Sequence, residues 1–333
     1  MKIAVFSTKA YDREFLSAAN ITAGNLHELV FHEVPLNIDS VLLAQGCTAV
    51  CCFVNDHLDK AVLAQLAQFG TKLVALRCAG FNQVDLTAAK ALGICVARVP
   101  EYSPHAIAEH ALGLILMLNR NLHRAHRRVH DNDYSLNGLL GFDLVNKTVG
   151  VIGTGKIGQV FAKIMQGIGC KVIAFDPVPN PMLLTAGVKF VSADELWSQA
   201  DIISLHCPLN PKTHHMINAN SIAQMKPGVM LINTGRGGLI DTRAVIGGLK
   251  AKKIGYLGLD VYEEEGDLFF EDNSNQLLQD DVFARLLTFP NVVITGHQAF
   301  FTREAVTAIS EITIANITFY EREDLNRVHC VTL

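Results

Sequence analysis

Short apolar runs rich in Val and Ile alternate with amphipathic helical patterns along the chain, and this alternation restricts the fold more than any other feature. The runs cover residues 3–6, 49–54, 73–76, 94–99, 149–152, 172–175, 202–205, 229–232, 256–259 and 292–295. Continuous apolar strands separated by helices are typical of a parallel sheet that helices cover on both faces. The pattern predicts an α/β protein, and 333 residues are enough for two doubly wound domains.

Composition excludes several classes of partner. The net charge is −4, so no basic field attracts nucleic acid or an anionic membrane surface. The longest apolar stretch, residues 111–118, is too short to span a bilayer. The eight cysteines form no C-x-x-C pair and lie mostly in apolar runs. They are typical of reduced thiols in a cytoplasmic protein, and we expect no disulfide framework.

Two charged stretches each allow two interpretations. The basic residues between Arg120 and His130 suit a nucleic-acid contact, but the acidic balance elsewhere favours a solvated helix end or a subunit contact. Residues 263–290 hold eight acidic side chains and one arginine, and carboxylates alone can bind a hard metal ion. Their spacing matches no metal-binding loop, so a solvated surface excursion is favoured and no metal is predicted.

A glycine-rich turn predicts a cofactor site. Gly153-Thr-Gly-Lys-Ile-Gly158 follows an apolar strand and opens a helix that is expected to run to about Gly167. Such a turn brings the backbone and the helix N-terminus to a pyrophosphate. Asp176 ends the next strand, eighteen residues after Gly158, where a carboxylate accepts ribose hydroxyls and repels the additional phosphate of NADP. Together these features predict NAD.

Three more strands of the same predicted sheet end in polar side chains. Arg236 follows the strand at 229–232, Glu265 follows the strand at 256–259, and His297 follows the strand at 292–295. Reduction of a ketone needs a proton donor, a cation near the developing alkoxide, and a carboxylate that holds the imidazole protonated. His297, Arg236 and Glu265 supply these groups. Spacing from Asp260 favours Glu265 as the partner of His297, with Glu264 as the alternative.

The chain resembles the D-isomer-specific 2-hydroxyacid dehydrogenase family over essentially its whole length, and two of its motifs resemble the lactate-forming branch. The resemblance rests on Arg77-Cys-Ala-Gly-Phe-Asn82, Val99-Pro-Glu-Tyr-Ser-Pro104, Val151-Ile-Gly-Thr-Gly-Lys-Ile-Gly158, Ser204-Leu-His-Cys-Pro-Leu209, Asn233-Thr-Gly-Arg-Gly-Gly-Leu-Ile-Asp241, Gly258-Leu-Asp-Val-Tyr262, Asp267-Leu-Phe-Phe-Glu-Asp272 and Gly296-His-Gln-Ala-Phe300. The last two mark the branch. The acidic segment at 263–290 is then an insertion that the branch shares.

The resemblance implies a two-domain architecture and a set of site residues. A flavodoxin-like substrate domain would comprise residues 1–100 and 300–333, and a Rossmann NAD-binding domain would comprise residues 101–299. A cleft would lie between the two domains. His297 would be the acid/base, Glu265 its partner and Arg236 the substrate anchor. Substrate contacts would come from Cys78, Ala79, Gly80, Tyr102 and Phe300. Cofactor contacts would come from Gly153, Thr154, Gly155, Lys156, Ile157, Gly158, Asp176, His206, Cys207, Pro208, Thr234, Gly235 and Asp260.

The implied reaction is reversible reduction of pyruvate to D-lactate with NADH, in the cytoplasm, by a homodimer or homotetramer. A bulkier 2-keto acid is an alternative substrate, although aromatic residues at 102 and 300 favour a small one. An NAD-sensing corepressor is an alternative from another class, and the absence of an appended tail argues against it. Gly235 and Gly238 depart from the family pattern, in which Ser and Ala are common beside the arginine.

Overall fold

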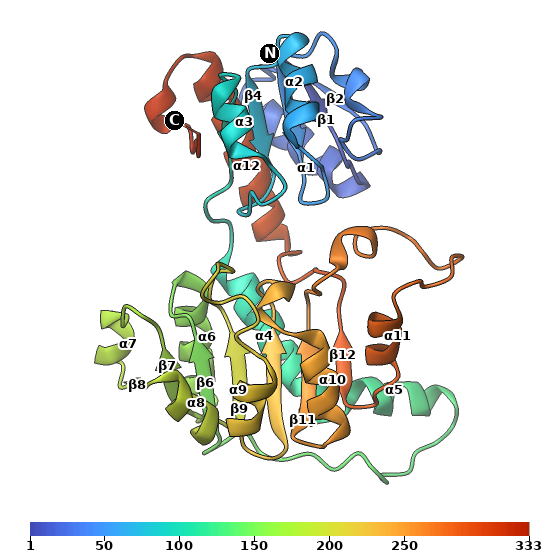
Figure 1. Ribbon diagram of the computed structural model, residues 1–333, viewed down its shortest axis with the longest axis vertical. Coiled ribbons are helices and arrows are strands. Elements are labelled where there is room, and N and C mark those ends of the chain that lie inside the picture. The colour runs from blue at the N-terminus through green and yellow to red at the C-terminus, as the bar shows by residue number, and fades with distance from the viewer. Residues whose placement is uncertain (333) are drawn as a thin grey trace. The chain divides into compact units, whose positions relative to one another are not determined.

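Two compact units share the chain (Figure 1). This computed structural model describes residues 1–332, without the side chain of Asp267. The first unit joins Met1–Ser103 to the C-terminal segment that starts at Phe301, and the second unit is Pro104–Phe300. The sequence predicts domain boundaries after residues 100 and 299, whereas the boundaries between the two units lie after residues 103 and 300. Tyr102 therefore belongs to the first unit and Phe300 to the second.

The first unit alternates strands and helices. Its elements are β1 (Lys2–Val5), α1 (Ala10–Thr22), β2 (Glu28–Phe31), η1 (Val41–Ala44), β3 (Ala49–Cys52), α2 (Lys60–Gln68), β4 (Leu73–Leu76), α3 (Leu86–Ala91), β5 (Cys95–Ala97), α12 (Arg303–Glu321) and η4 (Leu325–Arg327).

A five-stranded parallel sheet of order β2-β1-β3-β4-β5 forms the centre of the first unit. Every residue of β3 and β4 is buried, as a sheet covered on both faces requires. α12 packs against α1 and β4, so the C-terminal segment completes this unit. β2 lacks the apolar-run signal because it is an edge strand, in which Glu28 is exposed and the next three residues are only half-buried.

The second unit is longer. Its elements are α4 (Pro104–Asn119), α5 (Leu122–His130), β6 (Thr148–Ile152), α6 (Lys156–Gly167), β7 (Lys171–Phe175), α7 (Pro181–Thr185), β8 (Lys189–Phe190), α8 (Ala193–Gln199), β9 (Ile202–Leu205), α9 (Ala219–Gln224), β10 (Val229–Asn233), η2 (Gly237–Leu239), α10 (Thr242–Lys250), β11 (Ile254–Leu259), η3 (Glu265–Asp267), α11 (Asp281–Leu287) and β12 (Val292–Ile294).

Its seven strands form a parallel sheet of order β12-β11-β10-β9-β6-β7-β8, which Figure 1 shows with β6, β9 and β11 labelled. The strand order reverses between β6 and β9, and ligands of doubly wound sheets bind at the carboxyl ends of the strands at such a switch point. The two sheets confirm the predicted α/β class with two doubly wound parallel-sheet domains.

The apolar stretch at 111–118 lies within α4, which packs against α6, β10 and β11. Leu114 and Leu118 approach Gly258 of β11 so closely that a Cβ there would lie 3.2 Å from each of them. Glycine at 258 therefore allows the helix to lie directly on the strand that leads to Asp260. No helix within residues 1–332 is long and apolar enough to cross a membrane.

Candidate active site

The glycine-rich turn between β6 and α6 leaves its backbone open. Gly153 has φ +87°, and a Cβ there would lie 2.6 Å from the backbone nitrogen of Cys207. A Cβ on Gly158 would overlap the carbonyl oxygen of Gly153. Gly155 is the N-cap of α6 and has open space where a Cβ would stand. The turn thus lies close to the loop that follows β9, here called the β9 loop. It directs the N-terminus of α6 at the open space beside Gly155, which suits a phosphate group.

Asp176 follows β7 and faces this turn. Its Oδ2 accepts hydrogen bonds from Thr154 N (2.6 Å) and Thr154 Oγ1 (2.9 Å), and its Oδ1 accepts one from Val178 N (2.9 Å). Burial opposes ionisation, but the hydrogen bonds from Thr154 and Val178 outweigh it and lower the pKa of Asp176. The side chain is therefore a carboxylate, which accepts hydroxyl groups and disfavours a second anion.

The β9 loop supplies His206, Cys207 and Pro208. Burial lowers the pKa of His206 to about 3, so the imidazole is neutral, and its Nε2 lies 2.9 Å from Ser204 Oγ. The ring also lies 4.8 Å from that of Phe161 in α6. Burial raises the pKa of Cys207 to about 11. These uncharged side chains form an apolar wall beside the glycine-rich turn.

The loop after β10 holds Arg236 by its backbone. Asn233 Nδ2 donates to Arg236 O (2.9 Å), and Gly235 N donates to Asn233 Oδ1 (3.0 Å). A Cβ on Gly237 would overlap the backbone of Tyr262, so this glycine permits a close approach between two loops. Gly235, one of the two departures from the family pattern, is less constrained, because a Cβ there would meet nothing nearer than 3.5 Å. The bonds of Asn233 fix the turn in spite of the extra glycines.

His297 follows β12 in a left-handed conformation, with φ +53°. Its Nδ1 lies 2.9 Å from Glu265 Oε1, while Glu265 Oε2 accepts a hydrogen bond from Tyr262 N (2.9 Å). The side chains of His297 and Glu265 are 18% and 22% exposed. Glu264 is an exposed side chain, so the structure pairs His297 with Glu265. Because Nδ1 faces a carboxylate, Nε2 is the nitrogen directed away from it.

Asp260 holds the turn that carries His297. Its backbone carbonyl accepts His297 N (2.8 Å), and its carboxylate accepts Gln298 N (2.9 Å) and Ala299 N (2.8 Å). Asp260 is fully buried. Burial opposes ionisation, but hydrogen bonds from His110, Thr295 and the two backbone groups outweigh it and lower the pKa of Asp260.

Sequence reasoning did not identify His110 and Thr295, which complete this network. Thr295 Oγ1 lies 2.5 Å from Asp260 Oδ1 and 2.9 Å from His110 Nε2. A carboxylate only accepts, so Thr295 donates its proton to Asp260 and accepts one from His110. His110 Nε2 also lies 3.4 Å from Asp260 Oδ1. His110 belongs to the apolar helix α4, and only its contact across the fold distinguishes it from a core residue.

Two other acidic residues of segment 263–290 make contacts within the second unit. Glu263 binds His215 Nε2, and its Oε2 accepts Thr242 Oγ1 (2.6 Å). Asp280 accepts the Tyr262 hydroxyl (2.6 Å) and caps α11. Among residues 1–332 no group of three His, Cys, Asp or Glu side chains is arranged to hold a metal ion.

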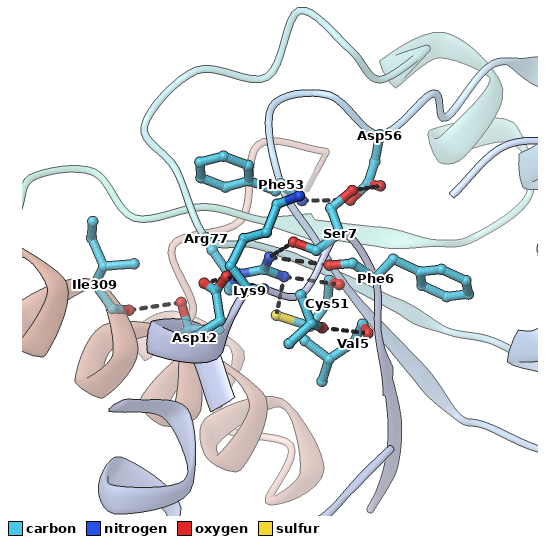
Figure 2. Close-up of polar contacts among 12 residues, drawn as sticks. Val5, Phe6, Ser7, Lys9, Asp12, Cys51, Phe53, Asp56, Arg77 and Ile309 are labelled. Atoms are coloured by element: carbon cyan, nitrogen blue, oxygen red, sulfur yellow. Dashed lines mark hydrogen bonds and ion pairs between the residues drawn. The ribbon is translucent and has the colours of Figure 1, made fainter. Parts of the chain in front are cut away.

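In the first unit, a buried arginine anchors the segment Cys78–Gly80. Arg77 is 1% exposed; its Nε donates to Asp12 Oδ1 (3.1 Å) and its Nη2 to Phe6 O and Ser7 O (Figure 2). Asp12 and Asp56, which accepts Ser7 Oγ at 2.7 Å, were not recognised from the sequence. Together these contacts join the carboxyl ends of β1 and β4.

The segment Cys78–Gly80 is further fixed through its carbonyl groups. Cys78 O accepts Val99 N (3.1 Å), and Ala79 O accepts Arg98 Nη1 (2.9 Å). Tyr102 is half-buried in the chain that follows, and Phe300 ends the second unit, also half-buried. His297, Glu265, Asp260, Thr234 and Arg236 thus lie after strands of one sheet, and Cys78, Ala79 and Gly80 lie after a strand of the other.

The glycine-rich turn, the ionised Asp176 and the neutral β9 loop are the features of a dinucleotide-binding domain of the doubly wound type. Residues 112–299 match the model of the D-isomer specific 2-hydroxyacid dehydrogenase NAD-binding domain. The chain belongs to this family, and it is an NAD-dependent oxidoreductase. The resemblance and the cofactor inferred from sequence are thereby confirmed.

Three similar proteins illustrate the relationship. D-lactate dehydrogenase of Escherichia coli is 52% identical over 322 residues, 97% of each chain. The solved structure of a pyruvate reductase of Chlamydomonas reinhardtii has a TM-score of 0.92 and 47% identity, and the match covers 97% of both chains. D-lactate dehydrogenase of Aquifex aeolicus, solved with NAD and lactic acid, has a TM-score of 0.88 and 33% identity over 99% of both chains.

Proposed function

We propose that this protein reduces pyruvate to D-lactate with NADH, and that it catalyses the reverse reaction. The pairing of His297 Nδ1 with Glu265 Oε1, beside Arg236 on the same sheet, is the observation that carries the proposal. An acid/base, its carboxylate partner and a carboxylate-binding cation are the groups that reduction of a 2-keto acid requires. The names of the similar proteins support the same substrate.

His297 transfers the proton. Glu265 stabilises the imidazolium through Nδ1, which leaves Nε2 to protonate the C2 oxygen of the substrate. When bound, NADH supplies the hydride. In the opposite direction neutral His297 accepts the hydroxyl proton at the same nitrogen, and Glu265 again stabilises the charge that develops on the ring.

Arg236 anchors the substrate. Its guanidinium presents paired N–H donors that match a carboxylate, and a cation beside C2 stabilises the alkoxide as it forms. In the first unit, the backbone N–H groups of Cys78, Ala79 and Gly80 bind the carboxylate, and the hydrogen bonds to the carbonyls of Cys78 and Ala79 hold this segment in place. Tyr102 contributes its hydroxyl, and Phe300 limits the space for the substrate side chain.

The cofactor is held by residues of the second unit. Gly153, Thr154, Gly155, Lys156, Ile157 and Gly158 bind the pyrophosphate, Asp176 binds the ribose, and His206, Cys207 and Pro208 line the adenosine. Thr234, Gly235 and Asp260 face the nicotinamide. The Oγ1 of Thr234 supports this assignment, because it is buried and has no hydrogen-bond partner among the described residues. A buried hydroxyl of this kind suits a polar ligand group.

His110 and Thr295 act as positioning residues. Asp260 accepts the N–H groups that immediately follow His297 and so maintains the left-handed turn. Donors from His110 and Thr295 keep its buried carboxylate ionised and oriented. Loss of either donor is expected to lower kcat through a displaced His297.

The protein assembles as a homodimer or homotetramer through the segment that begins at α5, and it functions in the cytoplasm. Several large apolar side chains of this segment are at least half exposed, including Tyr134 (71%), Leu136 (83%) and Leu140 (90%). A second copy of the chain would cover them. Light scattering of Leu140→Glu tests the assembly, because a mass equal to that of wild type would contradict an interface at this segment. Cell fractionation tests the location in the cytoplasm.

Turnover on a panel of 2-keto acids tests the substrate. Pyruvate, 2-ketobutyrate, 2-ketoisocaproate and phenylpyruvate are compared, with NADH consumption followed by absorbance. The highest kcat/KM is expected for pyruvate. Preference for one of the two bulky acids would assign a different substrate at the same site, and NADH binding without turnover of any of them would favour a sensing role.

A further inference from the structure

Two cysteines that are 235 residues apart in sequence meet in the first unit. Cys95 is the first residue of β5, and Cys330 lies in the segment after η4. This segment runs antiparallel to β5, with Ala97 opposite Cys330. Arg98 N donates to His329 O (3.1 Å), and Val331 N donates to Val96 O (2.8 Å). Backbone pairing therefore fixes the register that brings the two thiols together.

The two sulfur atoms are in direct contact. Cys95 Sγ donates to Cys330 Sγ, and the atoms are 2.7 Å apart. Cys95 is 5% exposed, whereas Cys330 is only half-buried. The hydrogen bond to Cys330 and burial both raise the pKa of the Cys95 thiol. Cys330 is the acceptor in this bond and the more exposed sulfur, so it is the thiol that a reagent meets first.

We propose that Cys95 and Cys330 form a redox-active dithiol, a modification site that small-molecule disulfides oxidise to an intramolecular disulfide. The proposal does not depend on the substrate of the enzyme. Disulfides in reducing compartments are usually transient and report the redox state, and a pair held in contact by backbone pairing is suited to that behaviour.

The reaction proceeds by two thiol–disulfide exchanges. The Cys330 thiolate attacks one sulfur of the small disulfide, which forms a mixed disulfide and releases one small thiol. The Cys95 thiolate then attacks the Cys330 sulfur, which closes the protein disulfide and releases the second small thiol. The two cysteines lose two electrons and two protons in total, and the small disulfide takes them up as two thiols.

Closure of this bond would connect the two separate chain segments of the first unit. Residues 1–103 and the segment that starts at 301 are joined only through the second unit in sequence. Arg98, three residues after Cys95, donates to Ala79 O, and Asn316 binds both Arg98 O (3.0 Å) and His329 N (3.0 Å). Oxidation would thus fix the C-terminal segment to the strand that supports the Cys78–Gly80 segment.

The test uses the purified full-length protein in glutathione buffers of increasing oxidised fraction. Samples are denatured in N-ethylmaleimide, and their intact masses are measured. As the oxidised fraction rises, we expect the number of maleimide additions to fall from eight to six, with loss of two hydrogen atoms. Proteolysis within residues 104–300 should then leave fragments that stay joined on a non-reducing gel and separate in dithiothreitol.

Serine variants identify the pair, and serine retains the size and a hydrogen-bonding group of cysteine. Cys95→Ser should retain a glutathione on Cys330 as a mixed disulfide, and Cys330→Ser should form neither product. Cys170→Ser is the matched control, because Cys170 is a buried thiol of the second unit that donates to Leu144 O, and it should still form the bond. Eight maleimide additions to wild type at every ratio would overturn the proposal, and so would joined fragments from Cys330→Ser.

Discussion

Replacement of Glu265 by Gln probes the contact on which proton transfer depends. The two carboxylate oxygens have separate tasks, because Oε1 faces His297 Nδ1 and Oε2 accepts Tyr262 N. A glutamine side chain has a single oxygen, so either His297 or Tyr262 would face an NH2 group. The variant therefore loses the charge and also leaves one donor unsatisfied.

The magnitude follows from these contacts. A hydrogen bond to a charged group contributes roughly 1.5–3 kcal/mol. Glu265 is 22% exposed, so solvent screens part of this interaction, and about 2 kcal/mol is the appropriate figure. That energy corresponds to a fall of about thirtyfold in kcat/KM for pyruvate. Because both directions pass through the same transition state, lactate oxidation at the same pH should fall by a similar factor.

Steady-state kinetics in both directions measures the effect, and quenching of protein fluorescence measures NADH affinity, which should be unchanged. Glu264→Gln is the matched control, since it removes the same charge from the neighbouring exposed residue and should stay within about twofold of wild type. Equal rates for the two variants would refute the assignment of Glu265.

Three further substitutions test other parts of the site. Asp176→Ala should weaken NADH binding and narrow the preference for NADH over NADPH, because an acceptor for ribose and a repulsive charge both disappear; an unchanged ratio of the two dissociation constants would contradict this role. Arg236→Lys retains the charge but loses the paired donors, so kcat/KM for pyruvate should fall about a hundredfold, or roughly 3 kcal/mol, with NADH affinity retained. Asp260 has a lowered pKa in the folded protein, so its contribution to stability is complete above the pKa of the unfolded chain and disappears as pH falls through the lower folded value. The Tm of Asp260→Asn should therefore be lower than that of wild type at neutral pH, and the difference should shrink below about pH 4. If the plots of Tm against pH for the two proteins are parallel, this carboxylate is excluded as the titrating group.

The fold was predictable from sequence where a signal is local. Strands such as β6 and β9 are continuous apolar runs, and their loops carry glycine, aspartate or histidine at the point where the strand ends. The edge strands β2 and β8 were not predicted, because partly exposed residues leave no apolar run. The capping box of Ser192 and Glu195 at the start of α8 is a local feature of the same kind.

Contacts between distant residues could not be predicted in this way. Arg77 and Asp12 are 65 residues apart, and each is unremarkable in its own segment. His110 lies within an apolar helix, 185 residues before Thr295, so only the packing of α4 on the sheet reveals its partner. Glu265 was favoured over Glu264 by spacing, and the fold distinguishes them because one side chain faces His297 while the other is exposed.

The configuration of the product tests the central claim most directly. Purified protein is incubated with pyruvate and NADH, and the lactate formed is resolved by chiral chromatography, with His297→Gln run in parallel. The account predicts that wild type forms D-lactate and that the variant binds NADH but forms almost none. Formation of L-lactate, or a variant as active as wild type, would contradict it.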